Sequence, residues 1–196
     1  MPKRDAVDLL AAYWLLSNPE EPDTIDNALR RTAKELGFSI DNEEIAQAVA
    51  QLGSTGDPGV WVVKMNFMAH PNLSWNILIA AVEVARTDDH LGKIAAGPAE
   101  HLLAHYGSFI PLFEWKAERD QKFLRMLTGV YRHRMSDKVW ARVRKLQAKV
   151  SDPLPQMQSF DRKDIGSELK VEDRENDDKG FYVLDQGEWR RRSEIS

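Results

Sequence analysis

The chain has 196 residues, of which 42% are apolar and 30% charged, and its formal net charge is -4. This composition supports a substantial buried core, so it excludes a chain that is disordered throughout. The absence of Cys excludes disulfides, thiolate metal sites and cysteine nucleophiles. No apolar run reaches the roughly 20 residues of a membrane span and no export signal is visible, so we expect a cytoplasmic protein.

The first half of the chain carries apolar residues at helical spacing, with capping residues at the ends of the runs. An opening helix is predicted from Val7 to Leu15. The second helix is predicted to begin after Thr24 and to end at Gly37. The third is predicted to begin with a capping box formed by Asp41 and Glu44, and to end at Gly53. Asp57 and Pro58 favour a fourth helix running to His70, although residues 60–63 also suit a strand.

Helical spacing continues in the second half. Residues 73–86 are apolar nearly all round, so we expect them to form the central helix. Further helices are predicted over 97–107 and 108–118, after Asp120 as far as Tyr131, and after Ser136 as far as Val150. Five predicted helices carry one Trp each, which we expect to be core anchors: Trp14, Trp61, Trp75, Trp115 and Trp140. The predicted fold is all-α, an irregular multi-helix bundle or a helical-repeat-like stack spanning residues 1–150.

The character of the sequence changes from Asp152 onward, so residues 151–196 are predicted to be a separate acidic tail. Residues 156–180 are polar and acidic, which indicates an extended or disordered segment. Apolar and basic residues return near the end, with the aromatic and aliphatic side chains of Phe181, Tyr182, Leu184 and Trp189. We expect these side chains to dock on the helical body. Two alternatives are that the segment forms a small hairpin across Asp185-Gln-Gly, or that it binds another chain.

The helix over 97–107 carries the most distinctive motif. At ~100° per residue, His101 and His105 project away from Leu102 and Tyr106, so both histidines are expected to face outward. Two His four residues apart, next to Glu100, permit a metal-dependent hydrolase. The sequence offers no Glu between them and no evident third ligand, so we predict neither metal nor cofactor. Our preferred interpretation is a surface for a protein partner, made by Glu100, His101 and His105 together with Phe181, Tyr182 and Trp189 of the tail.

Other catalytic patterns are missing from the sequence. It has neither a Gly-x-Ser-x-Gly elbow nor a glycine-rich phosphate loop, so no catalytic residue is predicted. Residues 116–149 hold 11 basic and 3 acidic residues, a local charge of +8. This excess gives nucleic-acid binding through Arg142, Arg144, Lys145 and Lys149 as an alternative function. A basic helix surface that is merely solvated, or that receives the acidic tail, explains the same pattern.

Residues 70–150 resemble a bacterial family of small proteins known only as a domain of unknown function. The resemblance rests on Gly97-Pro-Ala-Glu-His-Leu-Leu and Tyr106-Gly, followed by Ala117, Asp120, Phe123, Leu127, Val130, Asp137, Val139 and Trp140. His101 departs from the family pattern, which has a second acid there. The resemblance implies a compact helical domain of bacterial or phage-related origin and supplies no catalytic residue. Because small helical proteins of this sort often bind other proteins, we expect a protein–protein interaction module, for instance an immunity or defence-associated factor.

Overall fold

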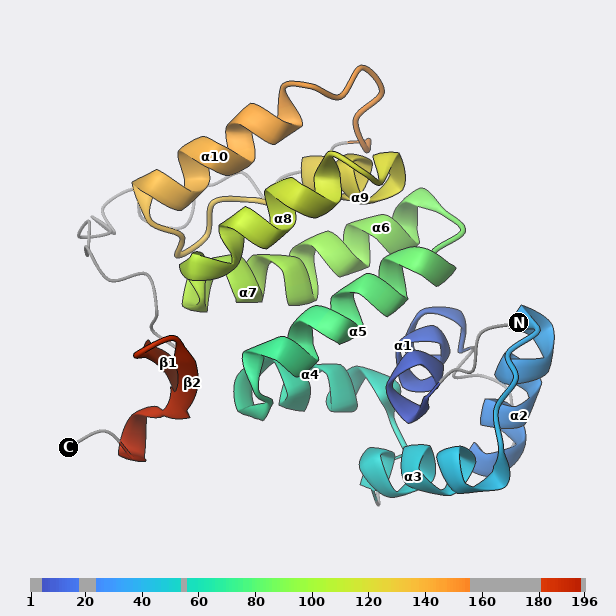
Figure 1. Cartoon of the computed structure of the whole chain (residues 1–196). Helices are drawn as coiled ribbons and strands as arrows, with labels where there is room; N and C mark the ends of the chain where they lie inside the picture. Colours follow the sequence, from blue (N-terminus) through green and yellow to red (C-terminus); the bar gives the residue numbers. More distant parts are fainter. Residues whose placement is uncertain (1–4, 18–23, 54–55, 156–180, 195–196) are drawn as a thin grey trace, which may run out of the picture. The chain divides into compact units, whose positions relative to one another are not determined.

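The computed structural model describes residues 5–17, 24–53, 56–155 and 181–194. These residues form helices and one two-stranded sheet (Figure 1), which confirms the expected mainly helical fold. They group into two compact units, unit 1 up to Arg86 and unit 2 from Thr87. The acidic stretch predicted to be extended, residues 156–180, lies outside the described residues, and the predicted boundary after residue 150 stays a prediction.

Unit 1 contains five helices: α1 (Ala6–Leu16), α2 (Ile25–Leu36), α3 (Asn42–Leu52), α4 (Pro58–Met68) and α5 (Pro71–Val84). The predicted N-caps are confirmed, since Thr24, Asp41 and Asp57 each accept a backbone N–H from the first turn of the following helix. Residues 60–63 are helical, and the strand alternative is wrong. Asp57 and Pro58 fix the helical start there, because a capping carboxylate and a pre-set φ outweigh a local β preference.

Within unit 1, α1 packs against the most helices, and the expectation that residues 73–86 form the central helix of the whole helical domain stays a prediction. Helix α1 packs against α2, α3, α4 and α5, whereas α5 packs within the unit against α1 and α4. Leu9, Leu10 and Ala11 have no exposed surface. Small alanines beside these leucines let several helices approach α1 closely, and a uniformly apolar sequence alone does not reveal this packing.

Unit 2 contains the remaining elements: α6 (Asp88–Ile94), α7 (Glu100–His105), α8 (Ile110–Ala117), α9 (Gln121–Met126), α10 (Asp137–Gln147), β1 (Tyr182–Asp185) and β2 (Glu188–Arg191). Its core includes the rings of Phe113 and Phe123, whose centroids lie 5.7 Å apart. Helix α9 is shorter than predicted, because a 3-10 turn follows it and Val130 is extended. No helix in the described parts of the chain is long and apolar enough to cross a membrane.

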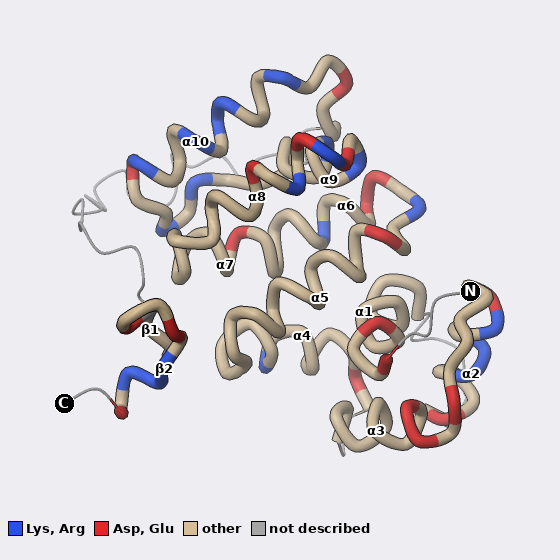
Figure 2. Tube along the Cα trace, viewed as in Figure 1, with Lys and Arg blue, Asp and Glu red and all other residues tan. Residues whose placement is uncertain are grey.

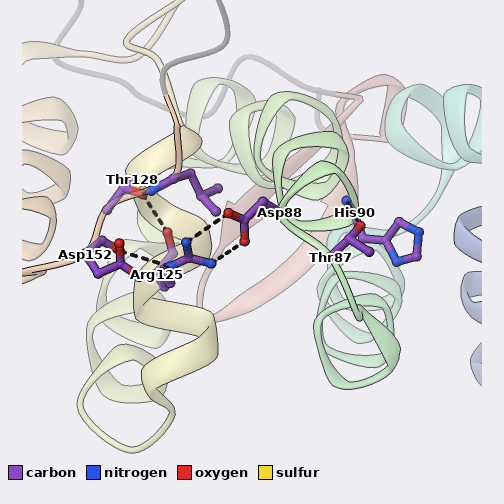
Figure 3. Close-up of polar contacts among 7 residues, drawn as sticks. Thr87, Asp88, His90, Arg125, Thr128 and Asp152 are labelled. Atoms are coloured by element: carbon purple, nitrogen blue, oxygen red, sulfur yellow. Dashed lines mark hydrogen bonds and ion pairs between the residues drawn. The ribbon is translucent and has the colours of Figure 1, made fainter.

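An Arg125 cluster joins three segments of unit 2 (Figure 3). The Arg125 guanidinium donates to both carboxylate oxygens of Asp88 at the start of α6, and its Nε donates to the carbonyl of Asp152 at 2.9 Å. The Thr128 hydroxyl lies 2.7 Å from the Arg125 carbonyl and accepts the N–H of Leu154 at 2.8 Å. Arg125 therefore fixes the segment after α10 to α6 and α9.

The strands β1 and β2 form an antiparallel hairpin in which Tyr182 pairs with Arg191 and Asp185 with Glu188. Gln186 and Gly187 both have positive φ, 48° and 88°. Positive φ at both central residues is the requirement of a type I′ turn, whose twist matches that of the strands, and glycine supplies it without steric cost. The hairpin that the sequence left open is therefore present.

Candidate binding surfaces

The helix that carries the two histidines begins where it was predicted. The run that starts after Thr87 as α6 reaches Gly97, whose non-helical angles (φ -101°, ψ -105°) kink the chain. Pro98 follows the kink and opens the turn that leads into α7. Proline suits a first helical turn, because its missing N–H has no partner there in any case.

His101 and His105 are half-buried, so the expectation that both face outward holds only in part. Their rings stack with centroids 4.4 Å apart. Burial, followed by the nearby His105 and His133, lowers the pKa of His101 to about 4. His101 is therefore uncharged at neutral pH, because its charged form loses hydration and faces other imidazoles.

Glu100 has a structural contact of its own. Its Oε1 accepts the backbone N–H of Tyr131 at 2.7 Å, which connects α7 to the segment between α9 and α10. Among the described residues, no group of three or more His, Asp or Glu side chains is placed to hold a metal ion.

The hairpin reaches the histidine helix through Trp189. Its indole meets the ring of Tyr106 edge to face at 5.4 Å and the ring of Phe109 at 5.5 Å. The predicted docking of the tail aromatics is thus seen for Trp189, whereas Phe181 is 62% exposed. Tyr182 lies under the guanidinium of Arg191 within the hairpin. Three of the six predicted partner-binding residues therefore lie near one another. Trp189 contacts Tyr106, and Tyr106 lies beside His101 and His105.

The predicted nucleic-acid-binding residues lie on two sides of α10. Arg142 pairs with Glu114 of α8, with its Nε donating to Oε1 at 2.8 Å. Lys145 and Lys149 also lie close enough to Glu114 to lower its pKa, after the larger effect of Arg142. Arg144 projects from another side, where its guanidinium lies 5.8 Å from the ring centroid of Trp140.

Only one of the five tryptophans expected to anchor the core is fully buried, Trp61 at 1% exposure. Trp14, Trp75 and Trp140 are half-buried. Trp115 is 54% exposed, and Arg119 lies over its ring at 4.6 Å. The expectation for Trp115 is wrong because α8 buries Ile110, Phe113 and Ala117, and residue 115 falls on the opposite side of the helix.

Helix α4 presents an apolar face to solvent that the sequence analysis did not single out. Val63, Phe67 and Met68 are 55%, 51% and 67% exposed, and Val60 is exposed beside them. By helical spacing, Lys64 falls between these four residues on the helix surface. It is the only charged residue of α4, and Figure 2 accordingly draws one blue stretch on this helix. We call these five residues the α4 face. Trp61 and Val62 are buried on the other side of the helix.

Comparison with known proteins finds a family without an assigned function. The model of a family of unknown function, DUF6869, matches residues 53–151, about half of the chain. This match confirms the resemblance predicted for residues 70–150 and extends it to include α4. No curated protein and no solved structure matches the chain.

Proposed function

Because the chain belongs to the DUF6869 family of unknown function, we propose its function from its own surfaces: it is a protein–protein interaction module that binds a partner through the α4 face. The observation that carries this proposal is the mismatch between the composition of α4 and its burial. The helix is apolar apart from Lys64 and Asn66, yet one side with Val60, Val63, Phe67 and Met68 is exposed. Helices that are apolar all round are normally covered on all sides.

The spacing of the exposed side chains suits recognition by a protein. Val60, Val63 and Phe67 follow each other at three and four residues, so they form one stripe along the helix. Such a stripe is the pattern with which a helix enters a groove of another protein. Phe67 supplies an aromatic anchor, and aromatic side chains are enriched at the energetic centres of interfaces.

Lys64 defines the chemistry of the partner. It lies in the middle of the stripe, so a two-fold contact between two copies of the α4 face would bring two lysines together. Opposed like charges cost several kcal/mol at an interface, which disfavours a second copy as the occupant. The expected partner is a different protein with an apolar groove that holds a carboxylate opposite Lys64. Because a standard interface uses about 20–30 residues a side, the α4 face is the apolar centre of a larger contact.

Site-specific photo-crosslinking tests the proposal. A photoreactive amino acid replaces Val63 in the full chain, which is then irradiated in cells that natively produce it. We expect one main adduct with another protein. Lys64→Glu should abolish the adduct, because it places two acids opposite each other. Circular dichroism should show an unchanged fold, since Lys64 is exposed.

The matched control carries the photoreactive residue at Ala50, an exposed position of α3 in the same unit. The proposal is contradicted by the absence of an adduct from position 63, by an adduct with lipid or with a second copy, or by the same adduct from position 50. An adduct that survives Lys64→Glu contradicts the proposed carboxylate.

An immunity factor is one form of this function, in which the partner is a toxin. Its support is the analogy with small helical binding proteins, together with the lack of an assigned activity for the family. Co-production of the crosslinked partner with the chain would test it. The growth defect caused by the partner should disappear with the wild-type chain and persist with Lys64→Glu.

A further inference from the structure

A second exposed surface lies in unit 2, where α8 and α10 pack side by side (Figure 1). We propose that it binds single-stranded nucleic acid. We call it the α8–α10 face and define it by Trp115, Arg119, Lys138, Lys145 and Lys149. It shares no residue with the α4 face, so this inference stands or falls independently of the proposed function.

The positive charge of this face comes mainly from one side of α10. Lys138, Arg142, Lys145 and Lys149 recur at intervals of four, three and four residues, which places them on one side of the helix. Basic residues accordingly mark α10 along its length in Figure 2. Arg142 is paired with Glu114, but the three lysines form no ion pair with any residue in the described ranges. Within the described part of the chain, no carboxylate within ion-pair distance neutralises these three lysines, which are all exposed.

The neighbouring helix adds an aromatic platform. The Arg119 guanidinium covers one part of the Trp115 ring, donates to the Trp115 carbonyl at 2.9 Å and leaves 54% of the residue exposed. Glu114, which precedes Trp115, pairs with Arg142 of α10, so the exposed indole lies on α8 next to the contact between the two helices. An exposed indole beside a row of cations is the combination that holds unpaired bases and their phosphates.

Two observations favour nucleic acid over an acidic protein as the ligand. The cations of α10 that lack an acidic partner are mainly lysines, which are depleted at protein interfaces and suit phosphate contacts. The negative charge of the chain also lies elsewhere, because residues 151–196 hold 8 basic and 12 acidic residues and thus account for the whole net charge of -4. The helical part that contains the face is neutral overall.

Fluorescence anisotropy with the full chain tests the inference. The probes are labelled oligo(dT) and oligo(U) of about 15 nucleotides, a duplex of the same length and a poly-glutamate peptide. We expect both single strands to bind more tightly than the duplex and the peptide. With four cations in contact, log K should fall against log salt with a slope of about -3. Equal affinity for the two strands indicates recognition of phosphate and base, and tighter oligo(U) binding adds a contact to the ribose hydroxyl.

Three variants locate the site. Replacing Lys138, Lys145 and Lys149 with Glu should abolish binding, and Trp115→Ala should weaken it roughly tenfold while Trp115→Phe retains it. A control replaces the exposed Lys34, Lys64 and Lys93 with Glu. Each triple variant changes the net charge by -6, from -4 to -10. The control should bind far better than the α10 variant.

The inference is overturned if neither oligonucleotide binds at low salt, or if both triple variants lose affinity equally. Tighter binding of poly-glutamate would assign the face to an acidic protein instead. Duplex binding as strong as single-strand binding, with no effect of Trp115→Ala, would contradict the role of the indole. A negative result in this binding assay would not contradict the proposed function, because the crosslink tests Val63 and Lys64 on another helix.

Discussion

At the scale of single residues, His101 makes the stability of the protein depend on pH. Burial and, to a smaller extent, the neighbouring His105 and His133 lower its pKa from 6.5 to about 4. The unfolded chain therefore takes up a proton between these two values that the folded chain does not, and the free energy of unfolding falls as the pH is lowered through this window. The contribution of His101 is fully present above pH 6.5.

Urea unfolding between pH 7 and pH 4 checks this prediction. His101→Gln should flatten the fall of the unfolding midpoint in that window, because the amide does not titrate. The exposed His133 provides the control, and His133→Gln should retain most of the wild-type slope. A His101→Gln profile parallel to the wild-type profile would show that His101 is not the group responsible.

At the scale of elements, the hairpin depends on the contact of Trp189 with unit 2. A two-stranded hairpin is marginally stable by itself, so its order requires docking. Trp189→Ala removes the ring contacts with Tyr106 and Phe109. Two aromatic pairs contribute about 1–3 kcal/mol together, so hydrogen exchange at the hairpin amides should become roughly 5- to 150-fold faster.

The core of unit 2 should keep its exchange rates in this experiment, since Phe113 and Phe123 are fully buried and pack against each other. Phe181→Ala is the matched control, because this aromatic residue of the same hairpin is mostly exposed. It should leave the hairpin amides unchanged. If Phe181→Ala accelerates their exchange as much as Trp189→Ala, the hairpin is held by something other than the Trp189 contact.

Helix ends were predictable from sequence where a capping residue marks them. Thr24, Asp41, Asp57, Asp120 and Ser136 all accept a backbone N–H as expected, since short polar side chains satisfy the unpaired donors of a first turn. Pro98 likewise marks a helix start as expected, because Gly97 before it takes non-helical angles and kinks the chain. The short distance between the end of α6 and this kink was not predicted.

At the scale of the whole molecule, the sequence predicted a helical protein but not which apolar faces are covered. The helical period correctly predicts that Trp115 and Phe67 lie on helices, but it does not predict whether they are buried. Burial depends on neighbours that are distant in sequence. The same limit applies to charge. The excess of cations in residues 116–149 was visible, but the pairing of Arg142 with Glu114 required the packing of α8 against α10.

The proposed role of the chain depends on the α4 face being a binding surface. The most direct test is the affinity of the crosslinked partner for two variants, in each of which one exposed side chain is replaced by Ala. Phe67→Ala should weaken binding about thirtyfold, the effect of losing an interface anchor worth about 2 kcal/mol. Leu112→Ala, which removes an exposed side chain from α8, should leave the affinity within about threefold of the wild-type value. Equal losses in the two variants, or a loss confined to Leu112→Ala, would contradict the account.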